Sequence, residues 1–257
     1  MALYRENMDK TLLKGLMVLE ALSLSESDAL SIDEASKLTG LTRSNAHRTL
    51  QTLASAGYVK HDLNKGGYCN TLKLVELGVR QLGRLNLREV AQENIARLAK
   101  KTGETIHLSI LDGMNVIYIA KVDSIQPIRA YSMIGGRAPA YAVATGKALL
   151  AAMGSAYVER FPETLVSYTA TTIVNIKTLL GQLADVRKLG YATNEGEWRE
   201  GVGGLAVPIF NGFNEAIAAI GISGPLSRLD RNRMIELAPA VMAEAYDISK
   251  SMGYAQK

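Results

Sequence analysis

The residues best suited to contact another molecule lie between Ser31 and Tyr68. When residues 42–56 are projected as a helix, Ser44, Arg48 and Gln51 fall on one side, opposite the apolar side chains. Arginine and amide side chains on a helix face can hydrogen-bond to the edges of guanine and adenine in the major groove of DNA. We therefore expect this helix to contact a DNA duplex.

Further donors flank this face and follow it along the chain. Candidates for base edges are Arg48 and Asn45, then Ser44 and Gln51, and candidates for phosphates are Arg43, Lys60 and Lys65. Between Glu34 and Asp62 no carboxylate is present to repel phosphates. The alternative is a merely solvated polar face, which would lack the steep salt dependence of DNA binding. The predicted DNA-binding set is Thr42, Arg43, Ser44, Asn45, His47, Arg48, Gln51, Lys60 and Lys65.

Two short helices joined by a glycine turn are predicted to position these residues. Ser31 and Glu34 form a capping box that begins the first helix, and Gly40 supplies the left-handed residue that ends it. Thr42 is a suitable N-cap for the second helix. This layout is typical of a helix-turn-helix, and a hairpin over residues 58–70 with a glycine-rich tip would form its wing.

Composition and charge allow two domains. The chain has 257 residues, of which 47% are hydrophobic, and its net charge is +4. The excess lies in residues 1–101, which hold 15 Lys and Arg against 11 Asp and Glu, whereas residues 102–257 hold 14 of each. This distribution fits an anionic partner for the first domain. Cys69 is the only cysteine, and no run approaches the ~18 apolar residues of a membrane span, so we expect a cytoplasmic protein that does not enter a membrane.

Hydrophobic spacing predicts a winged helix-turn-helix domain over residues 7–70, a linker helix over 71–86 and a second domain over 87–253. The leucines at 12, 16, 19 and 22 predict a first helix packed behind the other two. One helix is predicted over residues 71–83, with Arg80 and Arg84 on its exposed side. A second helix is predicted over residues 87–101.

The second domain alternates between hairpins and helices. The predicted strands span residues 105–111, 116–122, 205–210 and 216–223, and the predicted helices span residues 145–153, 176–189 and 227–252. Turns at Asp112-Gly113 and Asn211-Gly212 join the strand pairs, Gly190 ends a helix, and Ser227 caps the last one. This order predicts an α+β domain with a central antiparallel sheet.

Catalytic chemistry is not evident in the second domain. His107 is the only histidine there, and a lone histidine in a strand is usually a hydrogen-bonded structural residue. The run Gly201 to Ala206 precedes a strand instead of following one, and Gly146-Lys147 lacks the leading glycine and the Ser or Thr of a phosphate loop. We predict no catalytic residue, no metal and no cofactor.

Nine motifs follow one another along the chain: LTRSNAHRTL (41–50), GYV (57–59), LG (77–78), LREVA (87–91), TGETIHL (102–108), GKALLA (146–151), GYA (190–192), GV (201–202) and ISGP (222–225). In this order and spacing they resemble the IclR family of bacterial transcriptional regulators. The resemblance implies an N-terminal winged helix-turn-helix, a linker helix and a C-terminal effector-binding domain of GAF-like fold. It also implies dimers, or dimers of dimers, on operator DNA.

In the family the effector lies against the sheet, beneath the loop and helix before the GK motif. The expected effector contacts are Met133, Tyr141, Ala144, Thr145, Gly146, Asn194, Gly204, Gly221 and Ser223. Asn194 stands where the family commonly has Asp, Gly204 where it has Cys, Gly221 where it has Ser, and Tyr141 where it has His. These losses predict a wider, less polar pocket for an effector larger than a two- or three-carbon acid, such as an aromatic acid. The alternative is that both glycines only allow tight strand packing.

Together these features predict a ligand-responsive transcriptional regulator, a repressor of a catabolic operon for a small organic or aromatic acid. Two other hypotheses remain open. One is an enzyme in the second domain with a purely structural helix-turn-helix, and the other is an architectural DNA binder without a ligand.

Overall fold

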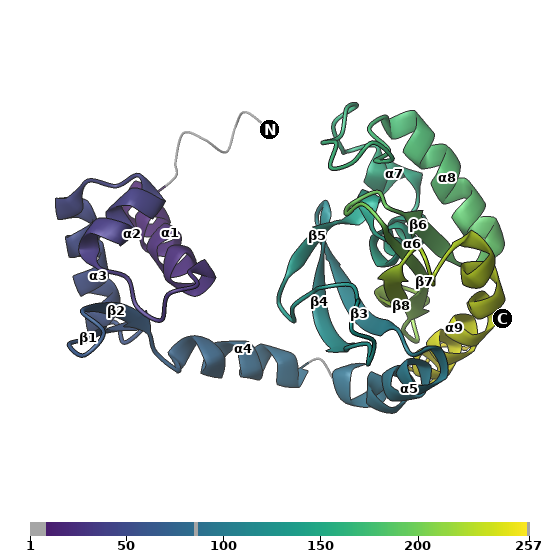
Figure 1. The fold of residues 1–257 in the computed structure, drawn as a ribbon, viewed down its shortest axis with the longest axis horizontal. Coiled ribbons are helices and arrows are strands. Elements are labelled where there is room, and N and C mark those ends of the chain that lie inside the picture. Colours follow the sequence, from purple (N-terminus) through teal and green to yellow (C-terminus); the bar gives the residue numbers. More distant parts are fainter. Residues whose placement is uncertain (1–8, 85–86, 256–257) are drawn as a thin grey trace. The chain divides into compact units, whose positions relative to one another are not determined.

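The structure, a computed structural model, describes residues 9–84 and 87–255, and the side chains of 79–84 lie outside the described part. The chain divides into two compact units, an N-terminal unit of residues 1–85 and a C-terminal unit of residues 86–257 (Figure 1). The predicted exposure of Arg80 and Arg84 falls on side chains outside the described residues.

The N-terminal unit is a three-helix helix-turn-helix followed by a two-stranded wing and a helix. Its elements are α1 (Lys10–Leu24), α2 (Ile32–Thr39), α3 (Arg43–Ser55), β1 (Val59–Asp62), β2 (Gly67–Asn70) and α4 (Lys73–Arg84). The predicted capping box is confirmed, because the backbone N–H of Ser31 donates to the Glu34 carboxylate at 2.8 Å and that of Glu34 to the Ser31 hydroxyl at 3.3 Å. Gly40 ends α2 with φ of 68°, a left-handed conformation that glycine adopts without strain.

The predicted first helix, packed against the other two, is confirmed, but only part of its leucine stripe is buried. The helix buries Val18 and Leu22 against α2 and α3, whereas Leu12 and Leu16 stay 62% and 49% exposed. At 100° per residue around the helix axis, the directions of Leu12 and Leu16 differ by more than a quarter turn from the mean direction of Val18 and Leu22. The helix therefore packs through one edge of its leucine stripe and leaves the other edge uncovered within this unit.

The C-terminal unit is built on one antiparallel six-stranded sheet. Its strands are β3 (Thr105–Asp112), β4 (Asn115–Val122), β5 (Arg137–Pro139), β6 (Ala192–Glu195), β7 (Val202–Phe210) and β8 (Ala216–Pro225), in the order β5-β4-β3-β8-β7-β6. The predicted central antiparallel sheet is confirmed. Sequence analysis missed β5 and β6, the two short edge strands.

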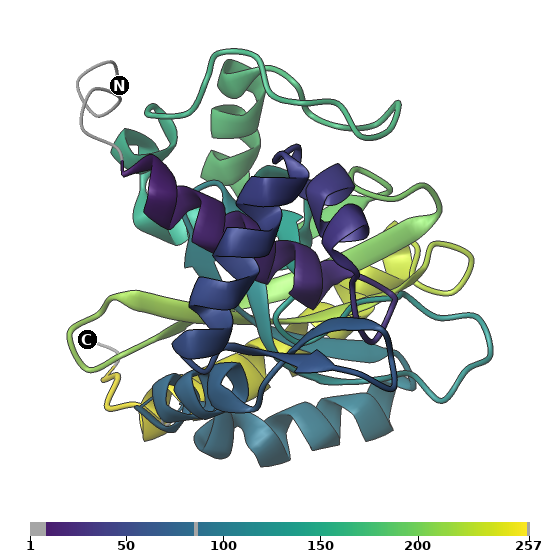
Figure 2. The same ribbon diagram turned by 90° about the vertical axis from the view of Figure 1, so that its left-hand side faces the viewer.

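Helices cover both faces of this sheet. One face packs against α5 (Leu87–Thr102) and α9 (Arg231–Ser251), which Figure 2 shows together on one side of the strands. The other face packs against α6 (Ala144–Met153), which in turn contacts α8 (Ile176–Leu189). A 3₁₀ turn over Ala140–Ala142 precedes α6, and the short α7 (Ser155–Val158) follows it.

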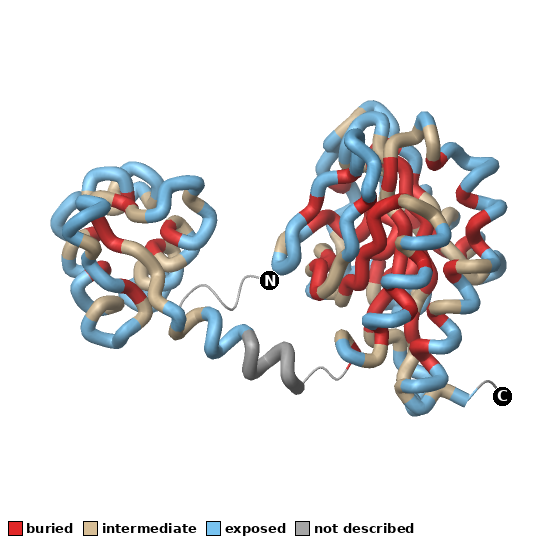
Figure 3. Tube along the Cα trace, turned by 60° about the horizontal axis from the view of Figure 1, so that its bottom comes forward, coloured by how far each residue is buried: buried red, intermediate tan, exposed pale blue. Residues whose placement is uncertain are grey.

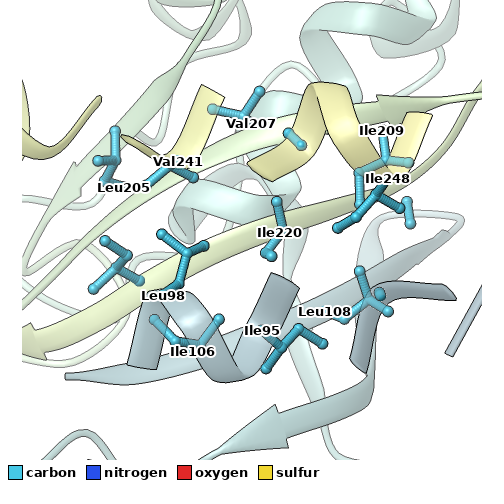
Figure 4. Close-up of a cluster of buried hydrophobic side chains, with 14 of the residues drawn as sticks. Ile95, Leu98, Ile106, Leu108, Leu205, Val207, Ile209, Ile220, Val241 and Ile248 are labelled. Atoms are coloured by element: carbon cyan, nitrogen blue, oxygen red, sulfur yellow. The ribbon is translucent and has the colours of Figure 1, made fainter. Parts of the chain in front are cut away.

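Strand alternation decides which side chains meet which helices. Ile106 pairs with Ile222 and Leu108 with Ile220, and these residues form the core against α5 and α9 that Figure 4 displays. Their neighbours along each strand therefore point to the face covered by α6. The strands lie at the centre of the buried core, as the red segments of Figure 3 indicate.

The last helix begins later than predicted. Asp230, and not Ser227, is its N-cap, because the Asp230 carboxylate accepts from the backbone N–H of Arg233 at 2.8 Å. Both residue types are good caps, so local sequence did not distinguish them. The helix predicted over 176–189 is confirmed, with Gly190 in the left-handed conformation at its end.

Candidate functional site

The exposed face of α3 carries most of the residues predicted to contact DNA. The Thr42 hydroxyl accepts from the backbone N–H of Asn45 at 3.3 Å and begins the helix, and the burial of Ala46 and Leu50 orients it. Arg43, Ser44, Arg48 and Gln51 are exposed, while Asn45 and His47 are half-buried. The outer face of α3 is therefore polar and accessible within its unit.

Asn45 and Arg48 also line an apolar groove between α3 and α1, which sequence analysis did not anticipate. The groove has a volume of about 670 Å³, and Leu12 and Leu16 of α1 form part of its wall. Asn45 and Arg48, the first candidates for base contacts, thus lie on the side of α3 that borders α1. Gln51 does not line the groove.

Two of the three cations predicted to contact phosphates have carboxylate partners. Arg43 contacts Asp33 at 2.6 Å, and Lys65 at the wing contacts Asp28 at 2.7 Å. Lys60 is exposed on β1. Exposed ion pairs contribute at most about 1 kcal/mol, so both carboxylates can be displaced by a phosphate.

The C-terminal unit contains a small cavity between the sheet and the first turn of α6, called the cavity below. Strand register aligns Asn194, Gly204 and Ser223 on the face covered by α6. The cavity has a volume of about 40 Å³, which is room for about three water molecules. Five predicted effector residues line it: Ala144, Thr145, Asn194, Gly204 and Ser223.

The other four predicted effector residues do not line this cavity. Met133 is 57% exposed. Tyr141 is buried, and its hydroxyl donates to the Val166 carbonyl at 2.9 Å. Gly146 packs against the backbone of Ala140, and Gly221 packs against the neighbouring strand. These four assignments rest on the resemblance alone.

The expected widening of the pocket is wrong at both glycines. A Cβ at Gly204 would overlap the Asn194 side-chain oxygen, and one at Gly221 would lie 2.8 Å from the Cβ of Ala206 and 3.0 Å from the Cγ2 of Thr145. The space of the missing side chains is filled by neighbours, because strand and helix pack together where no side chain separates them. The tight-packing alternative therefore describes both positions.

Ten further residues that sequence analysis did not assign to the effector site line the cavity, most of them polar or aromatic. They are His107, Tyr118, Ala130, Tyr131, Ser132, Val143, Trp198, Arg199, Val202 and Ile222. Trp198 is the only tryptophan of the chain, and the guanidinium carbon of Arg199 lies 4.5 Å from its ring centroid. A single tryptophan next to an arginine, between Gly196 and Gly201, was the signal that could have identified this segment.

His107 is hydrogen-bonded, as predicted for a lone strand histidine. Its Nε2 lies 2.6 Å from the Ser132 hydroxyl, and the Lys121 ammonium donates to the Ser132 carbonyl at 2.6 Å. Burial, with a smaller contribution from Lys121, lowers the pKa of His107 to about 4. Such a ring is neutral and weakly basic at neutral pH, so the geometry lends no support to His107 as a general base.

The lowered pKa of His107 predicts that the protein loses stability in acid. Because its pKa is lower in the folded protein than the ordinary 6.5, its contribution is complete above pH 6.5 and is lost as the pH falls towards 4. Between pH 7 and 4.5 we expect the loss to be about 2 kcal/mol of the free energy of unfolding. Urea unfolding at both pH values measures it. The His107→Gln variant should lose less than the wild type over this interval, and an equal loss in both proteins would contradict the assignment.

Residues that carry hydrogen-bond donors line the cavity. The N-cap of α6, Val143, offers no side-chain acceptor to the first-turn N–H groups of that helix, and Val143, Ala144 and Thr145 line the cavity. Thr145, Ser223 and Arg199, whose side chains carry further donors, also line it, and the Ser223 hydroxyl donates to the Gly203 carbonyl at 3.4 Å. Helix N-termini and arginine favour anionic oxygen atoms, so this arrangement suits a small carboxylate.

The described part of the chain contains neither a metal-binding cluster nor a helix that could span a membrane. Within residues 9–84 and 87–255 no three His, Cys, Asp or Glu side chains are grouped to hold a metal ion. None of the helices described is both long and apolar enough to cross a bilayer.

Comparison with known proteins identifies the family of both domains. Residues 11–63 match the family model of the IclR helix-turn-helix domain, and residues 79–250 match that of the bacterial transcriptional regulator IclR C-terminal region. The chain is 38% identical to the HTH-type transcriptional regulator KdgR of Escherichia coli (strain K12), over 95% of this chain and 93% of that protein.

Solved structures share the fold over nearly the whole chain. The crystal structure of the Thermotoga maritima IclR has a TM-score of 0.77 and 30% identity, covering 95% of this chain and 99% of that one. An IclR homolog from Microbacterium hydrocarbonoxydans, complexed with 4-hydroxybenzoate, has a TM-score of 0.81 and 24% identity, covering 94% and 98%. At the latter identity the likeness concerns the fold alone. The chain belongs to the IclR family of bacterial transcriptional regulators, as its motifs predicted, and is a DNA-binding transcriptional regulator.

Proposed function

We propose that this regulator represses a catabolic operon and responds to a small organic acid bound in the cavity. Residues 7–70 would bind operator DNA, residues 71–86 would link the two domains, and residues 87–253 would bind the effector. The observation that carries the proposal is that a single chain combines a winged helix-turn-helix with a cavity lined by hydrogen-bond donors.

The protein would act as a dimer or a dimer of dimers on double-stranded DNA. A two-fold assembly places two recognition helices about one turn of duplex apart, so the operator should be a pseudo-palindrome. Selection from random oligonucleotides at moderate ionic strength tests this. Enrichment of a two-fold symmetric motif supports the proposal, and recovery of no preferred sequence contradicts it.

Arg48 is proposed to contact a base edge. The Arg48→Ala variant should lose about 1–3 kcal/mol of binding free energy on the selected operator and should relax specificity at one base position. Gel shifts on the operator and on single-base variants of it measure both effects. The side chain is exposed on α3, so the substitution should leave the fold intact.

Lys65 provides the matched control for this assignment. As a phosphate contact on the wing, it should affect all sequences alike, so Lys65→Ala should weaken operator and random DNA by similar factors. Equal losses on both DNAs for both variants would contradict the division between base and phosphate contacts.

The dimensions of the cavity favour a small effector. With a cavity volume of about 40 Å³, a two- or three-carbon acid would require much less movement of the walls than a benzoate would. The 4-hydroxybenzoate bound by the Microbacterium homolog makes an aromatic acid the natural competitor in a test. Its carboxylate would meet the same donors, Arg199, Thr145 and the α6 N-terminus.

Trp198 allows the effector class to be tested directly, because it lines the cavity and is the only tryptophan. Titration of its fluorescence with glyoxylate and with 4-hydroxybenzoate should show tighter binding of the smaller acid. A preference for the benzoate contradicts the size argument. Release of operator DNA by the acid that binds would establish the response, since a ligand must favour the state that leaves DNA.

A further inference from the structure

The C-terminal unit contains a fully buried ion pair that does not line the cavity. Lys147, the second residue of the GK motif, is 0% exposed, and its ammonium lies 2.6 Å from Oε1 of Glu197 and 3.0 Å from Oε1 of Gln182. The pair thus joins α6 to the segment after β6 and to α8. Neither Lys147 nor Glu197 is among the residues of the cavity wall.

Stability alone is a poor explanation for this pair. Burial raises the pKa of Glu197 and lowers that of Lys147, because removal from water penalises both charges. The second carboxylate oxygen of Glu197 is buried without a hydrogen-bond partner among the described residues. Well-packed apolar residues in place of a buried ion pair are often equally or more stabilising. A gain in stability therefore does not account for the pair.

Glu197 is held from more than one side. Its carbonyl accepts from the Thr172 hydroxyl at 2.6 Å, and the preceding carbonyl of Gly196 accepts from the Thr169 hydroxyl at 2.8 Å. Its side chain is held by Lys147. The backbone of this segment is therefore fixed immediately before Trp198, the first of its residues in the cavity wall.

The same helix supplies the anchor and part of the opposite wall. Thr145 lines the cavity two residues before Lys147 on α6, and Trp198 and Arg199 line it directly after Glu197. A bond between Lys147 and Glu197 consequently sets the distance between the α6 wall and the Trp198 wall.

We infer that Lys147 and Glu197 are positioning residues that hold Trp198 and Arg199 against the cavity. Neither would touch the ligand. Their pairing would instead determine whether the guanidinium of Arg199 stays in reach of a carboxylate bound at the α6 N-terminus. This inference rests on the proposed function only for the identity of the ligand. The exposure of Trp198 can be measured in the absence of any ligand.

Acrylamide quenching of Trp198 fluorescence is the test. The variants are Glu197→Gln, which weakens the contact, and the double variant Lys147→Met with Glu197→Met, which removes both charges and keeps apolar packing. We expect the quenching constant of the double variant to rise about twofold or more, because a segment released from its anchor opens to solvent. Glu244→Gln is the control, since Glu244 pairs with Arg97 at 2.7 Å on α9 and α5, on the opposite face of the sheet.

Folding and positioning are separated by the double variant. If it unfolds at the same urea concentration as the wild type yet is more strongly quenched, the pair has a positioning role. Wild-type quenching in both the Glu197→Gln and the double variant overturns the inference. If the double variant unfolds at a lower urea concentration than the wild type, the quenching of the Glu197→Gln variant is measured under conditions in which that variant is folded. Stronger quenching than in the wild type then supports the positioning role, and wild-type quenching overturns it.

Ligand titration distinguishes this inference from the proposed function. Glyoxylate or 4-hydroxybenzoate, whichever binds the wild type, should bind the double variant at least about tenfold more weakly, since each misplaced charge-assisted contact costs roughly that factor. Unchanged affinity overturns the inference. If neither acid binds the wild type, the proposed effector class is wrong, while the quenching result still decides the role of the pair.

Discussion

Replacement of Gly146 by alanine is expected to lower the free energy of unfolding of the C-terminal unit by about 3 kcal/mol or more. An added Cβ would overlap the carbonyl oxygen and the Cα of Ala140. Both atoms belong to backbone in a 3₁₀ turn that is itself fully buried, so no flexible side chain can move aside. Either α6 or the turn must shift, and α6 packs against the sheet that carries the cavity.

Urea unfolding followed through Trp198 measures this loss, since that tryptophan lies in the same unit. Gly181→Ala is the matched control, because Gly181 lies within α8 and an added Cβ there has nothing within 4 Å. The control should be stabilised by about 0.5–1 kcal/mol through helix propensity. A Gly146→Ala protein as stable as the wild type would show that α6 does not approach Ala140 as closely as described.

Replacement of Lys147 by methionine is expected to cost about 3–5 kcal/mol, because it leaves the Glu197 carboxylate buried without its cation. Lys147 is 0% exposed and the Glu197 side chain 8%, so water cannot replace the lost contact without rearrangement. The loss should diminish as the pH falls, since protonation removes the uncompensated charge and burial already raises the pKa of Glu197.

The second substitution of the pair provides the control for this loss. Adding Glu197→Met to Lys147→Met should recover most of the stability, because the buried charge is then absent. Urea unfolding of the single and double variants forms a double-mutant cycle with Glu197→Met. Equal destabilisation in the Lys147→Met and double variants would contradict an uncompensated charge as the cause.

Local elements were predicted well because short-range interactions determine them. The capping box of Ser31 and Glu34, the turn at Asp112-Gly113 and the left-handed Gly190 all depend on residues within a few positions of one another. The missed strands β5 and β6 lie at the sheet edges and span three and four residues. Such strands are too short for alternation to be recognised, and their pairing depends on distant partners.

The cavity was predicted only in part for the same reason. Asn194, Gly204 and Ser223 were identified through the family motifs, and strand register confirms that they lie side by side. Ser132, Trp198 and Arg199 come from connections outside the strands, whose approach to the sheet no local pattern encodes. For Gly204 and Gly221 the sequence allowed two interpretations, a wider pocket or tight strand packing, and the structure, which closes strand and helix around both, favours the second.

The amino-acid sequence by itself determined most of the local elements and the polar face of α3, because caps, turns and periodic burial act over a few residues, and its motifs indicated membership of the IclR family. Only the tertiary structure decided that Lys147 meets Glu197 and that Trp198 and Thr145 line the same cavity of about 40 Å³. Those residues lie about fifty positions apart in the chain. Their approach depends on sheet register and helix packing, and the same hydrophobic pattern is compatible with more than one register and packing.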